Sequence, residues 1–182
     1  AAGFAIAMTL AVLSHRHRWL VPPLMGVTGV LYTVPSIAFF FLLLPITGFG
    51  TDTAVIALTA YTLQIIYRNA IAGLANVPAD AKDAGRGMGM TERQLLWRVE
   101  LPLAVPEIFA GLRVATVSTV ALATLAFLAG AGGLGEPLYN QVSFLTNIIL
   151  VGVLAIGMAL AFDGLLFGVQ RVATPWRRVR AR

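Results

Sequence analysis

The stretch that decides the fold is WLVPPLMGVTGVLYTVPSIAFFFLLLPITGFGT, residues 19–51, which contains no charged side chain. A helix needs about 20 predominantly apolar residues to cross a bilayer, and this stretch is longer than that. Residues 114–135 and 137–162 form two further uncharged stretches of sufficient length. These lengths predict that lipid, rather than water, surrounds much of the chain.

The composition of the whole chain agrees with a membrane location. Hydrophobic residues make up 58% of the sequence and charged residues only 12%, and the mean hydropathy is +0.84. Soluble domains typically carry about 25% charged residues, so a soluble globular fold is excluded. The chain contains no cysteine, which also excludes disulfides and thiolate chemistry.

The uncharged stretches, with one short stretch extended through Arg68, predict four complete transmembrane helices. They lie near residues 20–45, 53–74, 107–129 and 147–169. Residues 1–13 are also apolar but cross only about half of the bilayer core, and cations follow this segment instead of preceding it as in a signal peptide. We therefore expect an all-α membrane protein with one transmembrane domain over residues 1–182 and five core helices, the first of them incomplete.

The positions of the cations predict the orientation in the membrane. All arginines and lysines fall into three segments, at residues 16–18, 68–113 and 171–182. The predicted helices place these segments on one side, whereas Asp52 and Glu136 are the only charges in the two loops on the other side. Cytoplasmic loops carry the excess of Lys and Arg. The prediction is therefore a multi-pass membrane protein whose carboxyl terminus is cytoplasmic.

The same distribution explains the net charge of +5. A strongly basic protein can bind nucleic acid, but here the cations follow the membrane topology, so no nucleic-acid partner is expected. A cluster of arginines near the carboxyl terminus is suited to anionic lipid headgroups. It consists of Arg177, Arg178, Arg180 and Arg182.

The cytoplasmic loop at residues 75–105 is too long for a simple connector and carries a helical pattern of its own. Pro78 suits the start of a helix, and Asp80 complements the dipole of its first turn. One face of this helix is predicted to be small and apolar, and the other polar. The small face contains Ala81, Ala84, Gly85 and Met88, and the polar face contains Asp80, Lys82, Asp83 and Arg86. Gly89 is expected to break the helix.

A second short helix is predicted directly after this glycine. Thr91 and Gln94 have the spacing of a capping box, in which each side chain bonds the backbone of the other residue. We expect the helix to end at Leu101-Pro102. Two amphipathic helices around a glycine can dock on a cytoplasmic protein or rest on the lipid surface. The face of Ala and Gly favours docking, because such small side chains anchor weakly in lipid but allow close protein contact.

Residues of this loop resemble the EAA motif of ABC importer permeases. The motif has Glu-Ala-Ala, then Gly four residues later, then Ile-x-Leu-Pro beginning ten residues after that Gly. The residues that match it, at every expected spacing, are Asp83, Ala84, Gly85, Gly89, Val99, Leu101 and Pro102. Asp83, Gly85 and Val99 depart from Glu, Ala and Ile, and Gly85 is expected to loosen the first helix. The resemblance implies a type I ABC importer permease of the bacterial inner membrane, in which this loop couples the membrane helices to an ATPase.

Further segments resemble the osmoprotectant branch of these permeases, which serves importers of glycine betaine, choline, carnitine and related quaternary ammonium solutes. They lie at residues 31–36, 44–50, 87–91 and 130–135. Methionine-importer permeases share the EAA loop and a similar glycine-rich segment, so a methionine-type or other small-solute permease is the alternative. An ATPase-independent channel or secondary transporter is the alternative of another class, although the sequence shows no internal repeat.

The resemblance also implies the other subunits of such an importer. They are a second permease subunit, identical or paralogous, two cytoplasmic ATPase subunits that hold ATP and Mg²⁺, and an external solute-binding protein. This chain is expected to have no cofactor, no metal and no catalytic residue of its own. Residues 130–135 spell Gly-x-Gly-x-x-Gly but follow a membrane helix rather than a strand, so they predict a tight turn at an external gate and no nucleotide site.

Candidate residues for the solute path or its gates are aromatic, small or acidic. They are Tyr32, Pro35, Ser36, Gly132, Gly133 and Asp163. Aromatic rings attract quaternary ammonium groups without a fixed negative charge, which suits Tyr32. Asp163 lies inside the last predicted helix, where an ionisable residue indicates either a function or a bond to a neighbouring helix. Its predicted structural partner is Arg68, which could instead reach the inner interface.

Overall fold

The computed structural model describes residues 1–137 and 145–175, and every regular element in these two ranges is helical. The α-helices are α1 (Ala2–Arg16), α2 (Val21–Thr33), α3 (Ser36–Thr47), α4 (Thr51–Ala75), α5 (Ala79–Gly87), α6 (Glu92–Leu95), α7 (Leu101–Ala123) and α9 (Leu145–Ala173). Turns of 3₁₀ helix lie at Arg18–Leu20 and Ala126–Ala129, and a π turn lies at Leu96–Glu100. The predicted all-α fold is confirmed.

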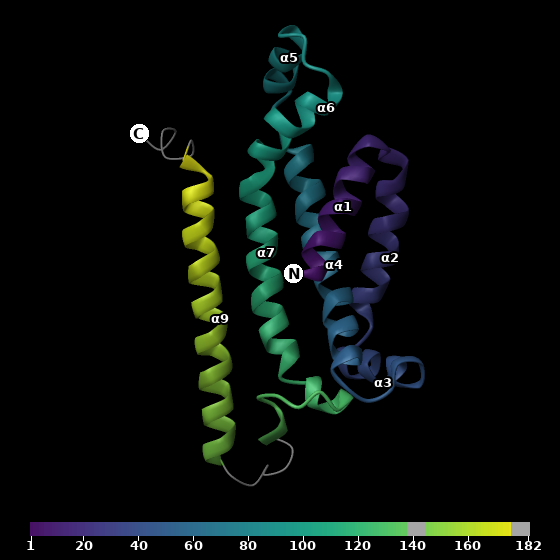
Figure 1. Cartoon of the computed structure of the whole chain (residues 1–182), viewed down its shortest axis with the longest axis vertical. Coiled ribbons are helices and arrows are strands. Elements are labelled where there is room, and N and C mark those ends of the chain that lie inside the picture. The colour runs from purple at the N-terminus through teal and green to yellow at the C-terminus, as the bar shows by residue number, and fades with distance from the viewer. Residues whose placement is uncertain (138–144, 176–182) are drawn as a thin grey trace.

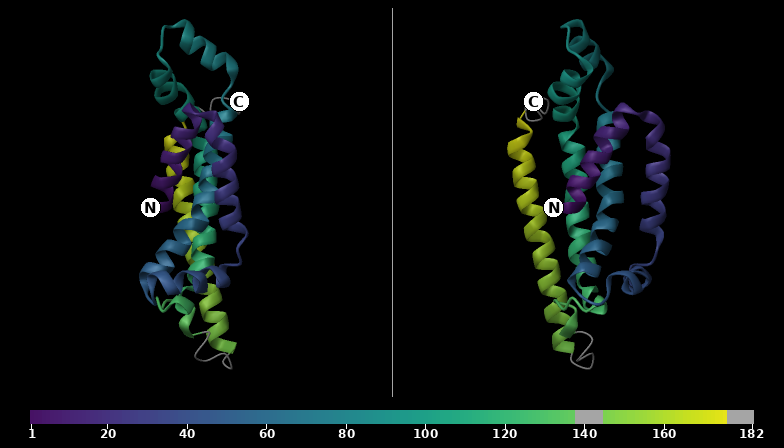
Figure 2. Two further views of the ribbon diagram at one scale, coloured as in Figure 1. Left: turned by 90° about the vertical axis from the view of Figure 1, so that its right-hand side faces the viewer. Right: turned by 45° about the vertical axis from the view of Figure 1, so that its right-hand side comes forward.

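Helix α4 is the centre of the bundle, with α1, α2 and α7 packed around it (Figure 1, Figure 2). On its buried face, the Tyr67 hydroxyl donates to Ser14 Oγ of α1 at 2.9 Å. A Cβ added at Gly73 of α4 would lie 2.9 Å from Glu107 Cβ of α7. Since real Cβ atoms do not approach so closely, a glycine at this position is required for the close packing of α4 and α7.

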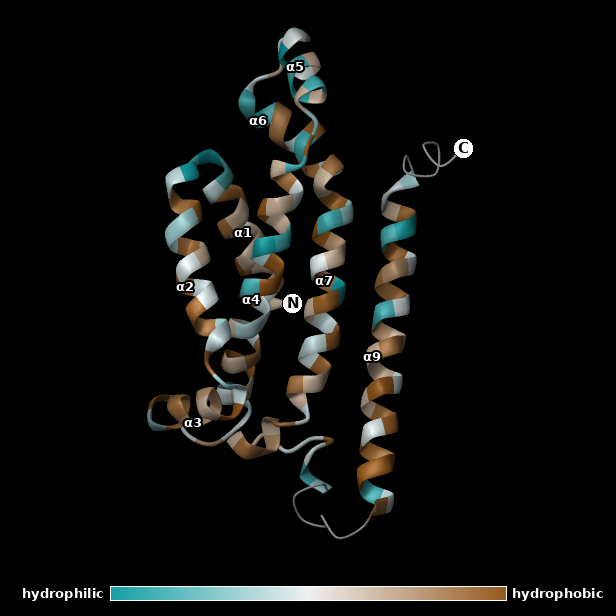
Figure 3. Ribbon diagram, turned by 180° about the vertical axis from the view of Figure 1, so that it is seen from behind, coloured by the Kyte–Doolittle hydropathy of each residue, from teal (hydrophilic) through white to brown (hydrophobic). Residues whose placement is uncertain are grey.

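Helix α9 lies on the outside of the bundle and packs mainly against α7 (Figure 1). Val151 is the one buried residue among those described in this helix, and the rest of its surface is largely apolar, as the brown colour in Figure 3 shows. A helix of 29 residues measures about 44 Å, more than the hydrocarbon core of about 30 Å. Its length and surface suit a helix that crosses the bilayer in contact with lipid.

The helices predicted near residues 53–74 and 147–169 are confirmed as α4 and α9. By length and composition, two helices of the described residues can cross a membrane, namely Glu92–Ala123 and α9. The bent pair of Arg18–Thr33 and Ser36–Thr47 would make a third. Helix α4 is long enough but carries several polar residues, among them Arg68, which is exposed. The count of five transmembrane helices therefore stays a prediction.

The prediction of one helix over residues 20–45 is wrong, because the chain breaks at Val34-Pro35. Helix α2 ends before this pair, α3 begins after it, and the two helices differ in direction by 100°. Val34 and Pro35 are both extended, with ψ values of 128° and 132°. Because proline disfavours the helical conformation of the residue before it, Pro35 ends α2 and turns α3 across one end of the bundle (Figure 1).

Two other predicted helix ends also differ from the structure. The helix predicted over residues 107–129 ends at Ala123, and a 3₁₀ turn follows. Leu101-Pro102 does not end the second loop helix, because α6, the π turn and α7 form one continuous run over Glu92–Ala123. A proline ring clashes with the carbonyl four residues before it in a regular α-helix. The π turn directly before Pro102 is where the helix accommodates this ring.

The two ends of the bundle differ in polarity (Figure 3). Helices α5 and α6, the α1–α2 turn and the last turn of α9 share one end, which we call the cationic end (Figure 1). It carries Arg16, Arg18, Lys82, Arg86, Arg93 and Arg171. Helix α3 and residues 124–137 lie at the opposite end, the acidic end, where Asp52 and Glu136 are the charged residues among those described. The arginine cluster predicted to contact lipid, at residues 177–182, lies outside the described residues.

Candidate functional site

The loop between α4 and α7 extends beyond the cationic end of the bundle (Figure 1). Helix α5 begins directly after Pro78, and Gly89 follows its end with a φ of +76°. Thr91 Oγ1 accepts a hydrogen bond from Gln94 N at 3.3 Å, and Gln94 Oε1 accepts one from Thr91 N at 2.9 Å. The predicted first helix, the break at Gly89 and the capping box are therefore confirmed as local structure.

The small face of α5 is not wholly free to dock, which differs from the prediction. Gly85 is buried, and a Cβ at this position would lie 2.6 Å from Leu95 Cδ1 of α6. Gly85 thus lets α5 pack closely on α6, and the expectation that it loosens the helix stays a prediction. Ala84 and Asp83 are exposed, and Met88 exposes 70% of its surface. These three residues belong to the exposed surface at and directly after the end of α5, which remains open to a partner.

A buried acid ties this loop to the rest of the bundle. Glu100, the last residue of the π turn, is only 5% exposed. Its carboxylate lies 3.4 Å from Lys82 Nζ of α5 and 2.6 Å from His15 Nε2 near the end of α1. Lys82 is therefore not on the outer polar face where the sequence pattern predicts it. Because a buried carboxylate is costly without partners, these contacts position α5 relative to α1 and α7.

The remaining residues of the EAA-like motif lie deeper in the loop. Val99, Leu101 and Pro102 are half-buried in the continuous helix that leads into α7. On the outer surface, Arg86 Nε donates to Glu92 Oε1 at 3.2 Å and joins α5 to α6. This hydrogen bond and the charge of Glu92 raise the pKa of Arg86 above its usual value. The motif thus combines an exposed part with an internal part, and its coupling role stays a prediction.

Three of the predicted path residues lie at the bend between α2 and α3, toward the acidic end. They are Tyr32, Pro35 and Ser36. The rings of Tyr32 and Phe39 pack edge-on against Tyr61 of α4, with centroid distances of 5.9 and 5.6 Å. The Tyr61 hydroxyl donates to the Val34 carbonyl and so stabilises the break. The bend therefore carries an aromatic cluster whose Tyr32 remains 46% exposed.

Gly132 and Gly133 lie in the turn that follows Ala126–Ala129, with φ values of 66° and 104°. Glycine adopts such angles without steric cost, and the predicted tight turn is confirmed. A hydrogen bond of 2.7 Å from Gly50 N to the Ala129 carbonyl attaches this segment to the start of α4. Gly132 also borders a cavity of about 670 Å³ at the acidic end.

Asp163 lies apart from the other predicted path residues, and Arg68 is not its partner. Arg113 Nε and Nη2 donate to the two carboxylate oxygens of Asp163 at 2.7 and 2.6 Å. The Arg113 guanidinium also lies 5.0 Å from the centre of the Phe167 ring, at a distance that allows a cation–π contact. Arg68 is instead exposed on α4. This bidentate ion pair joins α7 to α9 at positions that lie away from the ends of both helices.

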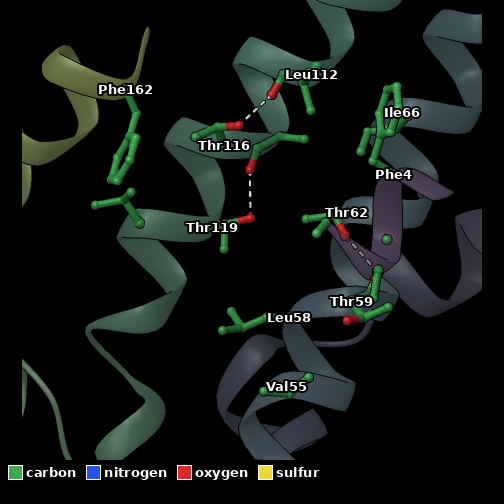
Figure 4. Close-up of a pocket in the computed structure, with 15 residues that line it drawn as sticks. Phe4, Val55, Leu58, Thr59, Thr62, Ile66, Leu112, Thr116, Thr119 and Phe162 are labelled. Carbon is green, nitrogen blue, oxygen red and sulfur yellow. Dashed lines mark hydrogen bonds between the residues drawn. The ribbon is translucent and has the colours of Figure 1, made fainter. Parts of the chain in front are cut away.

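A second cavity, of about 380 Å³, lies between α1, α4, α7 and α9 (Figure 4). The hydroxyls of Thr62, Thr116 and Thr119 line it, but each donates to a carbonyl of its own helix at 2.7 to 2.8 Å. Thr59 also lines the cavity, and the remaining side chains around it are apolar, among them Phe4 and Leu58 (Figure 4). No charged side chain lines this cavity, so it suits only an apolar or weakly hydrated group.

Sequence reasoning missed two groups of charged partners, namely one ion pair and one network around a buried acid. Arg113 and Asp163 each interrupt an otherwise apolar stretch of a predicted helix, and this shared feature is a signal for pairing that could have been used. The network of Glu100, Lys82 and His15 has no such signal. His15 is far from the other two residues in the sequence, and only the packing of α1, α5 and the π turn brings the three together.

Comparison with known proteins identifies the family. The profile of the family described as the binding-protein-dependent transport system inner membrane component matches residues 3–178. An osmoprotectant import permease protein of Salmonella typhimurium is 41% identical over 177 residues, which cover 93% of this chain and 82% of that protein. A carnitine transport permease protein of Listeria monocytogenes is 39% identical, with 82% of this chain and 69% of that protein covered. A choline transport system permease protein of Bacillus subtilis is 32% identical, with 95% and 81% covered.

A solved structure supports the fold. The inward-facing MetNI methionine ABC transporter contains a chain that matches with a TM-score of 0.81, covering 95% of this chain and 88% of that one. At 22% sequence identity this likeness shows the fold alone, which is that of an ABC importer permease. The relatives are permease subunits, and together with the apolar helices they show a multi-pass membrane protein. The chain belongs to the family of binding-protein-dependent transport system inner membrane components.

Proposed function

We propose that this chain is the transmembrane subunit of an ATP-driven importer for quaternary ammonium osmoprotectants such as glycine betaine, choline and carnitine. The observation that carries this proposal is the 41% identity, over 93% of the chain, with an osmoprotectant import permease. The relatives named for carnitine and choline transport support the same class of solute. These solutes share a bulky, weakly hydrated ammonium group, which aromatic side chains attract without binding it tightly.

The energy for import comes, in this proposal, from a separate protein. Two ATPase subunits, which hold ATP and Mg²⁺, dock on the cationic end at the surface formed by Asp83, Ala84 and Met88. Two features of α5 support this docking, namely its position beyond the bundle and its attachment through Lys82 to Glu100. A helix fixed in this way passes a movement on to α1 and α7. This chain then needs no cofactor or metal of its own and is not an enzyme.

The remaining partners complete the importer. A second permease subunit, identical or paralogous, faces this chain across the solute path, and an external binding protein delivers the solute to the acidic end. The description of the family as part of a binding-protein-dependent system supports that partner. The distribution of Arg and Lys supports a cytoplasmic location for the cationic end and for the carboxyl terminus. The aromatic bend at Tyr32 and the turn at Gly132 and Gly133 then belong to the path or its external gate.

A methionine importer is the second candidate. It is favoured by the structural likeness to a methionine transporter, but the relatives of higher sequence identity carry the names of osmoprotectant, carnitine and choline permeases. An ATPase-independent channel or secondary transporter has no comparable support, because the family is that of binding-protein-dependent systems.

Uptake measurements test this proposal. Cells without their own osmoprotectant importers receive this gene together with its ATPase and binding-protein genes. Labelled glycine betaine, choline, carnitine and methionine are then offered after osmotic upshift. We expect uptake of at least one quaternary ammonium solute to depend on the gene and to stop when the ATPase is inactivated. Uptake of methionine alone would contradict the proposed solute class, and uptake that survives ATPase inactivation would contradict the importer mechanism.

A further inference from the structure

The cavity at the acidic end combines aromatic rings with a carboxylate. Its lining includes Phe41 of α3, Phe127 of the 3₁₀ turn, residues 130–132 and Glu136. Its volume of about 670 Å³ lies in the range of ligand-binding pockets, which is about 300 to 1,000 Å³. Phe41 is 49% exposed, so its ring is accessible from the cavity. The pocket is therefore large enough, and open enough, to admit a small organic solute.

The glycine turn holds the carboxylate of Glu136 at the edge of this cavity. A Cβ added at Gly132 would lie 3.4 Å from Glu136 Oε2, at an ordinary van der Waals distance, so the carboxylate lies directly beside the glycine turn. Glu136 N also donates to the Gly133 carbonyl at 3.2 Å, which fixes the backbone that carries the acid. Among the described residues of the acidic end, the charged ones are Glu136 and Asp52. The local potential at this end is therefore negative.

This combination fits one chemical class of ligand. A quaternary ammonium group has no N–H to donate and is weakly hydrated, so it prefers aromatic faces, and a carboxylate attracts its charge from a longer distance. We propose that this cavity is an entry site for quaternary ammonium solutes, in which Phe41 and Phe127 contact the methyl groups and Glu136 supplies the negative charge. The inference rests on the proposed function and adds the location at which the solute enters this chain.

The entry site predicts a difference between choline and glycine betaine, which the proposed function alone does not predict. Choline has a net positive charge, whereas glycine betaine carries a carboxylate of its own, which Glu136 repels. The cavity therefore favours choline over glycine betaine, relative to the same cavity with a neutral side chain at residue 136. Because Glu136 is exposed, water and salt screen its charge and the preference is modest.

The first test replaces the charge and keeps the shape. Glu136→Gln is introduced into the complete importer, and initial uptake rates of choline and glycine betaine are compared at constant osmolality, set with a non-ionic osmolyte at low salt. We expect the ratio of choline to glycine betaine uptake to fall about two- to fivefold. Asp52→Asn removes the other acid of this end, which does not line the cavity, and is the matched control with an unchanged ratio.

The second test addresses the aromatic contact. Phe41→Leu removes the ring but keeps an apolar side chain, and we expect it to lower the uptake of both solutes, whereas Phe41→Tyr keeps the ring and most of the uptake. An unchanged uptake ratio in Glu136→Gln would overturn the entry site, and so would a loss in that variant that is equal for both solutes, because an equal loss there indicates impaired folding or impaired docking of the binding protein. A wild-type importer that carries no quaternary ammonium solute would instead overturn the proposed function.

Discussion

At the scale of single residues, the turn at Gly89 has the most direct consequence for coupling. Its φ of +76° lies in the left-handed region, where a residue with a Cβ costs about 1–2 kcal/mol. A Cβ at this position would meet no atom of the chain within 4 Å. A side chain here would therefore point into the space that a docked ATPase would occupy, without disturbing the packing of the loop itself.

We expect Gly89→Asp to abolish solute uptake while the protein still inserts into the membrane. The added carboxylate obstructs docking, and its charge changes the surface next to Asp83. Gly89→Asn is the matched variant of the same shape without the charge, and both residues tolerate the left-handed region better than other side chains. Uptake and the amount of membrane-inserted protein are measured together.

Ile149→Leu, a conservative change on the exposed surface of α9, should leave uptake unchanged. Normal uptake in both Gly89 variants, at normal amounts of protein, would contradict the coupling role of this loop.

Residue-level predictions from the sequence succeed where the cause is local. The capping box of Thr91 and Gln94 depends on residues three apart, and the structure contains both of its bonds. The orientation of Gly85 and Lys82 depends instead on α6 and on Glu100, which pack against α5 from outside the helix. Periodicity assigns Gly85 to the small face and Lys82 to the polar face, but it does not show that α6 covers the first or that Glu100 binds the second, because it describes a helix without its neighbours.

At the scale of elements, one ion pair contributes to the attachment of α9 to α7, beside a hydrogen bond from Gln170 Nε2 to the Pro106 carbonyl. This helix buries little of its surface in the chain, and its bidentate contact to α7 joins Arg113 to Asp163. Both side chains remain about 30% exposed, so we expect a contribution below that of a fully buried pair, about 1–2 kcal/mol.

Asp163→Asn should therefore lower the thermal stability of the detergent-solubilised protein, because it leaves the Arg113 guanidinium without a counter-charge inside the helix bundle. The double variant Arg113→Asp with Asp163→Arg restores opposite charges and should recover most of the stability. Uptake by the same variants distinguishes a structural role of Asp163 from a direct role in transport. Recovery of stability and uptake together indicates a structural pair, whereas recovery of stability alone indicates that Asp163 takes part in transport. A melting temperature unchanged by Asp163→Asn would contradict the proposed attachment of α9.

The element boundaries show which proline effects the sequence can reveal. Pro35 follows Val34 inside an uncharged stretch, and the known restriction on the residue before a proline predicts the break that length alone does not. Pro102 has the opposite outcome, because the π turn of Leu96–Glu100 carries the helix past it. The two prolines have the same local chemistry. Whether the helix continues depends on the surrounding packing, which a single sequence does not contain.

At the scale of the whole molecule, the separation of charge between the two ends connects topology with function. Uncharged lengths and cation positions predict that three segments share one side of the membrane. The structure places most of their described residues at one end of the bundle (Figure 1), whereas Arg113 lies farther along α7, where it pairs with Asp163. The exposed surface of α5 lies at that end, and the cavity with Glu136 lies at the other. If the cationic end is cytoplasmic, the ATPase and the incoming solute approach this chain from opposite sides, as an importer requires.

Thiol labelling tests that orientation, because the chain contains no cysteine of its own. Single cysteines are placed at Asp52, His17 and Glu92, which are all exposed. In intact cells, an impermeant reagent should label residue 52 alone. Opening the membrane should then make residues 17 and 92 reactive as well. The reverse pattern would contradict the positive-inside assignment and place the EAA-like loop away from any cytoplasmic ATPase. Labelling of residue 17 together with residue 52 would show instead that the α1–α2 turn and α5 lie on different sides, against the arrangement of the bundle.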